Sequence, residues 1–446
     1  MTEDAVNAFI EAASVDIRGW HGGGTLEQAE KILAANPGIA TAGIYSAAVL
    51  GNQAAIHQWL EREAKLAASK GGPHGWDALT YLCFSRYLRI HKDRSESFAA
   101  CARMLLESGA EANTGWTNEI DDPSKPFIEA AIYGAAGVAQ SAAVTQVLID
   151  FGADPNDGET AYHVAETYDN EVLKILLRSG RFNERSLATV AMRKCDWHDD
   201  AGLLLVLEHG ANPNYLSVWK HTPLHQSIRR DNGLVMIEHL LDHGADPLLA
   251  NTLDRRNAFQ MSAHHGRGDI LDAFDRRGFK YEFKGMDALV AACARGQTDA
   301  AQAMMNQTLQ LRESFLAMGG TLLARFSGPG NDAGVRTLLQ LGISPNALWE
   351  GDGYWDLAPG STALHVAAWR ANHQLVRTLI AAGAGVNACD SRNRTSLQLA
   401  VKACTDSYWK YRRQPDSIAA LLAAGAATDG IPLPTGYEAI DQLLIQ

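Results

Sequence analysis

His163 and Glu166 are the residues whose types and spacing come nearest to a chemical site. They lie three positions apart in a segment of helical pattern, so their side chains can meet on one helix face. An imidazole beside a carboxylate can act as an acid–base pair or supply two metal ligands. The alternative is that Glu166 answers a nearby arginine or backbone N–H, because a carboxylate at a packing position is costly unless it is paired. Both interpretations stand, and we favour the second.

A second charged segment, residues 196–200, reads Asp-Trp-His-Asp-Asp and falls at a predicted turn. Asp196 and His198 could join the acid–base groups, or the segment could bind a metal together with Asp169 and Asp231. No second His or Cys stands at the usual zinc spacing, so we predict no metal and no cofactor. The commoner role of such residues is to cap the following helix, where aspartate favours the helix dipole.

Both segments belong to a two-helix unit that recurs along the chain and is clearest over residues 220–249. Thr222 and Pro223 suit the start of a helix, and residues 231–233 end it. A second apolar helix follows and stops at Gly244, the expected left-handed position. We therefore expect helix, tight turn, helix and hairpin loop in each unit.

About eleven such units follow one another, and the chain is predicted to be an all-α solenoid. No unit can bury its apolar face alone, so stacking supplies one continuous core. We expect an N-terminal cap at 1–40, a repeat array at 41–430 and a C-terminal cap helix at 431–446. The eighth unit lacks the usual ending, and the eleventh carries an insertion at 408–414. The units span 44–60, 76–110, 127–156, 160–180, 186–214, 220–249, 257–278, 287–306, 321–342, 362–384 and 395–426.

The start of the sixth unit, Thr222-Pro223-Leu224-His225, resembles the ankyrin-repeat signature closely, and Thr362-Ala363-Leu364-His365 matches it almost as well. Periodic Gly-Ala endings extend the resemblance over nearly the whole chain, which implies an ankyrin-repeat solenoid. The chain also resembles a group of bacterial ankyrin-repeat proteins, through residues 71–88 and 195–200. That second resemblance implies no activity for this chain.

In an ankyrin repeat, the positions just before the mid-repeat turn point into a concave groove. We expect the side chains at those positions to face solvent and, from the fifth repeat onward, to grip an anionic surface, because arginine suits carboxylate and phosphate. The alternative is ordinary polar surface. Exposed aromatic residues at the hairpin tips would add interface anchors, unless they only cover neighbouring hairpins. The groove residues are Tyr133, Tyr168, Arg193, Lys194, Arg229, Arg230, His264, His265, Arg295, Trp369 and Arg370, and the tip aromatics are Trp116, Trp219, Trp349, Tyr354 and Trp355.

Composition narrows the class of protein. The 446 residues carry 39 Lys and Arg against 51 Asp and Glu, and the net charge of -12 argues against a general nucleic-acid binder. No apolar run is long enough to cross a bilayer, and the N-terminus lacks a signal sequence. Six scattered cysteines fit small buried fillers in a reducing compartment. We expect a cytoplasmic monomer with no nucleic-acid or membrane partner.

Two functions remain in view, and we favour the first. In the first, the groove binds a partner protein or a small anionic ligand, with Trp76 and Tyr81 added to the contact residues. In the second, a hydrolase or lyase acts on an anionic or sugar-like small molecule in a polar pocket of the second to sixth repeats. That pocket would be lined by Trp76, Tyr81, Tyr133, Glu159, His163, Glu166, Asp169, Asp196, His198 and Arg229.

Overall fold

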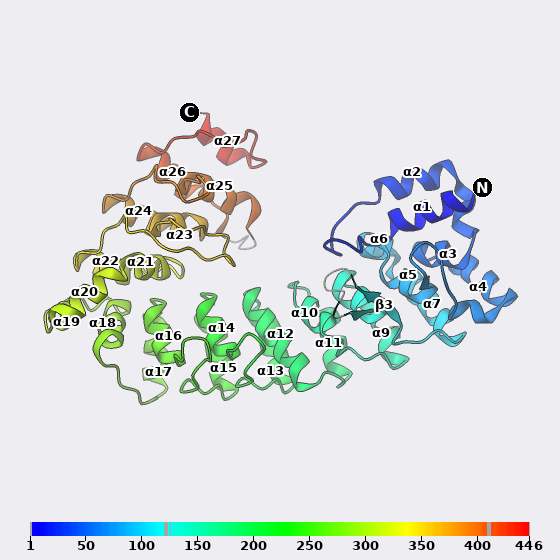
Figure 1. Cartoon of the computed structure of the whole chain (residues 1–446), viewed down its shortest axis with the longest axis horizontal. Coiled ribbons are helices and arrows are strands. Elements are labelled where there is room, and N and C mark those ends of the chain that lie inside the picture. Colours follow the sequence, from blue (N-terminus) through cyan, green and yellow to red (C-terminus); the bar gives the residue numbers. More distant parts are fainter. Residues whose placement is uncertain (1, 120–123, 125, 408–411, 446) are drawn as a thin grey trace. The chain divides into compact units, whose positions relative to one another are not determined.

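The computed structural model describes residues 2–119, 124, 126–407 and 412–445. Helix pairs make up most of it, and they belong to two compact units (Figure 1). Unit 1 comprises residues 1–217 and 242–244. Unit 2 comprises residues 218–241 and 245–446.

Unit 1 starts with two packed helices, α1 (Glu3–Ala13) and α2 (Glu27–Ala35), and continues with five helix pairs. Two antiparallel hairpins interrupt the helices: β1 (Lys70–Gly71) with β2 (Trp76–Asp77), and β3 (Gly115–Asn118) with β4 (Phe127–Ala130). Neither hairpin was predicted, because runs of two to four residues are too short to show alternation. The extra helix α6 (Arg86–Ile90) lies between the two helices of the second pair. The pairs are α3 (Ile44–Leu50) with α4 (Gln53–Arg62), α5 (Ala78–Cys83) with α7 (Ser95–Glu107), α8 (Ala131–Tyr133) with α9 (Ala142–Asp150), α10 (Glu159–His163) with α11 (Glu171–Arg178), and α12 (Glu184–Asp196) with α13 (Asp200–Glu208).

Unit 2 contains the sixth to eleventh helix pairs and ends with α27 (Glu438–Leu444). The first helices of successive pairs pack on one another: α14 on α16, α16 on α18, α21 on α23 and α23 on α25 (Figure 1). The pairs are α14 (Pro223–Arg229) with α15 (Leu234–Asp242), α16 (Ala258–His264) with α17 (Gly268–Arg276), α18 (Gly285–Ala294) with α19 (Thr298–Met305), α21 (Gly319–Ser327) with α22 (Asp332–Gln340), α23 (Ala363–Trp369) with α24 (His373–Ala381), and α25 (Ser396–Asp406) with α26 (Asp416–Ala423).

The signature histidine starts each well-formed repeat by closing a capping box. The backbone N–H of Thr222 donates to Nδ1 of His225 at 3.3 Å, and the Thr222 hydroxyl caps the helix in return. Thr362 and His365 repeat the arrangement at 3.1 Å. Burial lowers the pKa of His225 to about 4, so the ring is neutral and Nδ1 remains an acceptor. These histidines are structural, which agrees with their place in the repeat pattern.

The eighth repeat departs from the others, as its missing terminator suggested. In place of a hairpin loop the chain forms α20 (Leu309–Ala317), which packs against α18, α19 and α21 and buries Phe315 completely. Thr308 caps this helix through its hydroxyl.

The turns that follow the first helices meet inside unit 2. The side-chain amide of Asn331 donates to the carbonyls of Gly266 and Ala294, at 2.7 Å each. At Gly328 the turns approach closely, because a Cβ there would lie 2.5 Å from Oδ2 of Asp231. Turns of the sixth to ninth repeats therefore lie within side-chain reach of one another.

Several other predictions concern the chain as a whole. Within the described ranges, no helix combines the length and the apolar character needed to cross a bilayer. Five of the six cysteines are buried, as predicted, whereas Cys389 is exposed. Part of the predicted insertion at 408–414, residues 408–411, lies outside the described residues. The boundaries of the two caps stay a prediction.

Candidate functional site

In unit 1, His163 and Glu166 belong to a chain of ion pairs. Nδ1 of His163 lies 2.9 Å from Oε2 of Glu166. Arg193, on α12, donates to Oε1 of Glu166 at 2.5 Å and to Oδ2 of Asp196 at 2.6 Å. Its guanidinium also stacks 4.1 Å from the ring centre of Tyr162. Arg193 is thus the nearby arginine that the second interpretation of Glu166 required.

The protonation of these groups follows from the pairing. Burial lowers the pKa of His163, but hydrogen bonds to Glu159 and Glu166 outweigh it and raise the pKa to about 9. Burial raises the pKa of Glu166, but His163 and Arg193 outweigh it and lower the pKa. A protonated imidazole has no lone pair with which to accept a proton or bind a metal. A catalytic role for His163, Glu166, Asp196 and His198 stays a prediction.

The 196–200 turn mainly caps the next helix, as the commoner interpretation predicted. Asp199 accepts the backbone N–H of Gly202 at 2.9 Å at the start of α13. Lys194 was expected to face solvent, but it is fully buried and its Nζ lies 2.7 Å from Asp199. His198 stands in the turn with a φ of 53°. Across the described ranges, no group of three or more His, Cys, Asp or Glu side chains is placed to hold a metal ion.

Three predicted contact residues of unit 1 form the interior of an aromatic cluster instead of a surface. Trp76 stacks on Trp116 with ring centres 5.5 Å apart and lies 5.1 Å from Tyr81. The hydroxyl of Tyr133 meets Nδ1 of His21 at 3.1 Å. Exposed fractions of Trp76, Tyr81 and Tyr133 are 5%, 0% and 4%. The β3–β4 hairpin, which the sequence did not reveal, brings Trp116 inward and covers them.

Other groove predictions divide between buried and exposed positions. His264 is 2% exposed, because its Nε2 lies 2.8 Å from Oδ1 of Asp287 on the next repeat. Trp369 is 7% exposed and lies beneath Lys402, with Nζ 5.3 Å from the ring centre. Arg193 is 9% exposed through the ion pairs described above. Tyr168, by contrast, is 52% exposed, as expected.

Arg230 and Arg370 are buried because the hairpin after the ninth repeat folds back over them. Nη2 of Arg370 lies 3.1 Å from Oδ2 of Asp231, and its guanidinium stacks 3.8 Å from the ring centre of Trp355. Arg230 lies 3.0 Å from the ring centre of Tyr354. Among the tip aromatics, Trp219 and Tyr354 are exposed as predicted. The expectation was wrong for Trp116, Trp349 and Trp355, which are at most 8% exposed.

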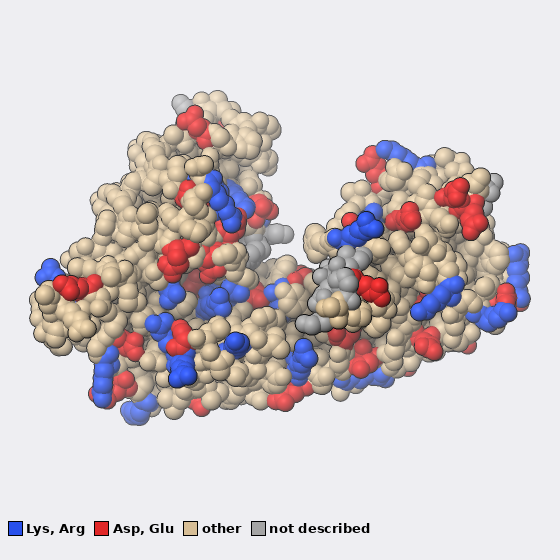
Figure 2. All heavy atoms as spheres, in the orientation of Figure 1, with Lys and Arg blue, Asp and Glu red and all other residues tan. Residues whose placement is uncertain are grey.

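Arg229, His265 and Arg370 are predicted groove residues that line an open pocket of about 240 Å³, formed wholly by unit 2. Its wall combines the ends of α14, α16, α21 and α23 with the hairpin at 349–357. On the face that Figure 2 shows, basic and acidic side chains intermingle over α14, α16 and α21. The pocket lies in the sixth to tenth repeats, and it shares only Arg229 with the pocket predicted for the second to sixth. Its charged lining is Arg229, Arg325, Arg370, Asp231, Asp254, Glu350 and Asp352.

Two guanidinium groups in this pocket lack an acidic partner. Neither Arg229 nor Arg325 forms an ion pair or a side-chain hydrogen bond with any residue that the structure describes. Burial, with Arg256 nearby, lowers the pKa of Arg325. Burial and the charges of Arg325 and Arg229 hold the pKa of His265 well below its usual value. The indole Nε1 of Trp349 is buried there and also has no acceptor in the described chain. An entering oxyanion would meet these donors beside the carboxylates of Asp254, Glu350 and Asp352.

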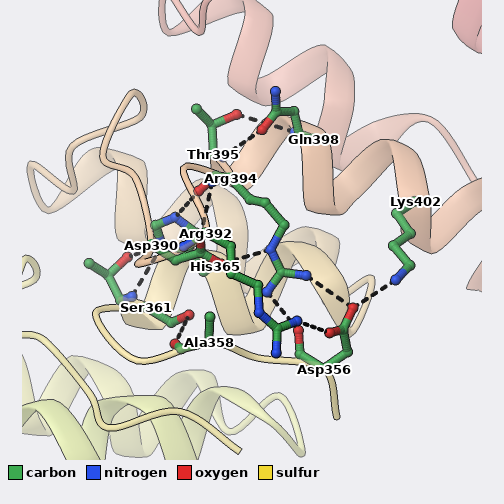
Figure 3. Close-up of polar contacts among 11 residues, drawn as sticks. Asp356, Ala358, Ser361, His365, Asp390, Arg392, Arg394, Thr395, Gln398 and Lys402 are labelled. Carbon is green, nitrogen blue, oxygen red and sulfur yellow. Dashed lines mark hydrogen bonds and ion pairs between the residues drawn. The ribbon is translucent and has the colours of Figure 1, made fainter. Parts of the chain in front are cut away.

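The hairpin that carries Trp349 and Trp355 is held in place from outside the pocket. Its strands pair through Trp349 N–H and the carbonyl of Ser361 at 2.9 Å. At its tip, Asp356 binds Arg392, Arg394 and Lys402, with Nη1 of Arg394 at 3.0 Å and Nζ of Lys402 at 2.7 Å (Figure 3). Burial raises the pKa of Asp356, but hydrogen bonds from Lys402 and Arg392 outweigh it and lower the pKa to about 2. We call these four residues the Asp356 latch.

The sequence did not predict that Arg325 lines the pocket or that the hairpin at 349–357 forms one of its walls. A usable signal existed for Arg325, which interrupts the apolar run from Leu322 to Phe326 in the way that Glu166, beyond the end of α10, interrupts its own repeat. No comparable signal marked the hairpin, because its position depends on contacts with α25 and with the loop before it. Arg295, another groove residue, pairs with Asp272 at 3.0 Å and Asp275 at 2.5 Å.

Two sequence comparisons with known proteins agree with the repeat geometry. A family model described as "Ankyrin repeat" matches residues 219–252 and 359–391, which contain the two best signatures. The human protein "Ankyrin repeat and MYND domain-containing protein 1" is 30% identical over 173 residues, which are 34% of this chain and 17% of that protein. The crystal structure of the human ASB11 ankyrin repeat domain shares 22% identity with a TM-score of 0.37, covering 49% of this chain and 90% of that one.

Helix pairs, most of them closed by a left-handed glycine and packed on their neighbours within each unit, define a helical-repeat solenoid. The family matches at its two clearest repeats show that the chain contains ankyrin repeats. Ankyrin repeats are protein-interaction modules, so the solenoid is a protein-interaction domain.

Proposed function

We propose that this chain binds an acidic segment of a partner protein, and that the pocket of unit 2 receives one carboxylate of that segment. The observation that supports the proposal most is the state of Arg229 and Arg325. Both line the pocket, and neither has an acidic partner within the described ranges. A half-buried guanidinium without a counter-ion is unfavourable, and a carboxylate from a partner would supply the missing pairing.

The other residues that line the pocket favour one carboxylate held at a fixed place over loose attraction to many charges. His265 is neutral there, so it can donate from one ring nitrogen without adding a charge that needs its own partner. Trp349 offers an indole N–H, and Trp355 and Val366 contribute apolar wall. A carboxylate on a short side chain would meet two forked donors and lose water on entry, which strengthens its hydrogen bonds.

The experiment is a binding titration by fluorescence anisotropy with a fluorescein-labelled poly-glutamate peptide. We expect saturable binding that weakens about tenfold for Arg229→Gln or for Arg325→Gln, because each removes charge-assisted hydrogen bonds worth about 1.5–3 kcal/mol. Raising the salt concentration should weaken binding of the wild type more than that of the double variant.

A matched control is Arg377→Gln, which removes the same charge from the exposed face of α24. It should bind the peptide as the wild type does. Equal affinity of the wild type and the Arg229→Gln, Arg325→Gln double variant would contradict the proposal. Binding of free citrate with no binding of the peptide would assign the pocket to a small anion instead.

A further inference from the structure

Five large apolar side chains are exposed on two neighbouring hairpins of unit 2. Single exposed apolar residues are ordinary, but a contiguous group marks an interaction surface. We call this group the hairpin patch. It consists of Val218 (64% exposed), Trp219 (38%), Leu248 (60%), Leu249 (37%) and Leu253 (59%).

The two hairpins are joined by hydrogen bonds, so their side chains form one surface. The backbone N–H of Thr252 donates to the carbonyl of Lys220 at 3.0 Å, and the Thr252 hydroxyl donates to the same oxygen at 3.3 Å. Lys220 directly follows Val218 and Trp219, and Thr252 directly precedes Leu253. The patch is therefore shared by the loops that begin the sixth and seventh repeats.

The second loop is also rigid. The side chain of Asn251 is buried at its centre, where its amide donates to Oδ1 of Asp254 at 2.8 Å and to the carbonyl of Arg256 at 3.0 Å. Its carbonyl oxygen accepts the backbone N–H of Leu253 at 2.9 Å. A surface that is already ordered loses little conformational entropy when a partner binds.

The patch reaches the pocket that holds the two arginines. Leu253 belongs to both, and Asn251 and His221, from the same two loops, also line the pocket. Resting on the proposed function, we infer that the partner segment carries a cluster of apolar side chains directly beside one acidic residue. The apolar side chains cover the hairpin patch while the carboxylate enters the pocket at Arg229 and Arg325.

Charge complementarity favours this mixed segment over a uniformly acidic one. The chain as a whole has a net charge of -12, so every additional acidic residue in a partner adds long-range repulsion. In the pocket, Arg229 and Arg325 both line the wall, while Asp231 and Asp254 are already paired with Arg370 and Arg256. Burial of the partner's apolar groups on Val218, Leu248 and Leu253 supplies affinity without adding charge.

The experiment is selection of a phage-displayed random peptide library on the full chain. We expect enriched peptides to contain an apolar cluster next to a single Asp or Glu. Their binding should weaken about tenfold in Leu248→Ser, Leu253→Ser protein, because two exposed contacts are removed. Val235→Ser, at a 53% exposed position of the outer helix α15, is the matched control and should change nothing. A thermal melt of each variant checks that it folds.

The outcomes separate this inference from the proposed function. Enriched peptides that are acidic throughout and bind the Leu248→Ser, Leu253→Ser protein normally would overturn the inference and leave the acidic-partner proposal standing. Peptides without an acidic residue, or ones insensitive to Arg229→Gln, Arg325→Gln, would overturn the acidic-partner proposal. No enrichment would count against both. A wild-type dimer that becomes monomeric in Leu248→Ser, Leu253→Ser would assign the patch to a second copy of this chain.

Discussion

Arg193 in unit 1 and Arg229 in unit 2 occupy the same position of the ankyrin repeat, yet their surroundings differ. Arg193 is 9% exposed, holds two carboxylates and stacks on Tyr162. Arg229 lines an open pocket and has no ion-pair partner in the described part of the chain. The comparison teaches that repeat position alone does not make an arginine available for binding. Availability depends on whether a neighbouring repeat supplies the carboxylate.

The same rule accounts for Glu166 and Asp231. Glu166 interrupts a packing position of unit 1 and is paired with Arg193 and His163. Asp231 stands in the mid-repeat turn of unit 2 and is paired with Arg370, which leaves Arg229 beside it without a partner. In both units the acidic residue stabilises the fold. Among the residues that the structure describes, Arg229 of unit 2 lines a pocket and has no ion-pair partner.

The largest predicted difference between the two arginines is in stability. Arg193→Gln should lower the free energy of unfolding by about 3 kcal/mol, because Glu166 and Asp196 would be left half-buried or buried without a counter-ion. Arg229→Gln should change it by less than about 0.5 kcal/mol. Urea unfolding followed by circular dichroism measures both. Similar decreases in the free energy of unfolding for the two variants would contradict the view that Arg193 stabilises the fold while Arg229 is available for binding.

A smaller, pH-dependent effect should distinguish the two units by its sign. The folded pKa of His163, about 9, lies above the ordinary 6.5, so its contribution is complete below pH 6.5 and is lost as the pH rises through 9. The folded pKa of His225, about 4, lies below 6.5, so its contribution is complete above pH 6.5 and is lost as the pH falls through 4.

Measuring the free energy of unfolding against pH tests both signs. The difference between wild type and His163→Gln should shrink by about 2 kcal/mol from pH 6.5 to pH 9, after allowance for solvent screening. The difference between wild type and His225→Gln should shrink between pH 6.5 and pH 4. Parallel curves for either variant and the wild type would show that the histidine is not perturbed as described.

The smallest effect concerns the Asp356 latch. Asp356→Asn should cost no more than about 1 kcal/mol, since its ion pairs are partly exposed. It should nevertheless speed amide hydrogen exchange over residues 349–361 and leave exchange over 223–229 unchanged, because the hairpin loses its outer attachment. Unchanged exchange in the hairpin would mean that Trp349 and Trp355 hold the wall by packing alone. Acid should have the same effect as the substitution. The folded pKa of Asp356, about 2, lies below the ordinary 3.8, so the stability that its ion pairs contribute is complete above pH 3.8 and is lost as the pH falls through 2.

The repeat architecture could be predicted from sequence because its determinants are local. Thr222 with His225 closes a cap within four residues, and Gly244 ends the second helix at a left-handed position, so each pair of helices is marked by its own residues. The β3–β4 hairpin and helix α20 were not predicted. They are short insertions stabilised by packing on neighbours, which leave little periodicity behind.

The candidate site could be predicted only in part, for a physical reason. Arg229 was identified from its repeat position, but the same reasoning also selected Arg230, His264, Trp369 and Arg370, which neighbouring segments cover. Their burial depends on contacts between residues far apart in the chain, such as Asp231 with Arg370. Arg325 was not identified, because it lies before the position that was compared between the repeats.

The most direct test of the account is to find where an acidic segment touches the chain. A poly-glutamate peptide carrying one benzophenone side chain is photo-crosslinked to the full protein, and mass spectrometry maps the adducts. We predict adducts at the pocket of unit 2, on residues such as Met261 and Leu253, and their loss in Arg229→Gln, Arg325→Gln protein. Adducts concentrated on residues 159–199 of unit 1, unaffected by those substitutions, would contradict the account.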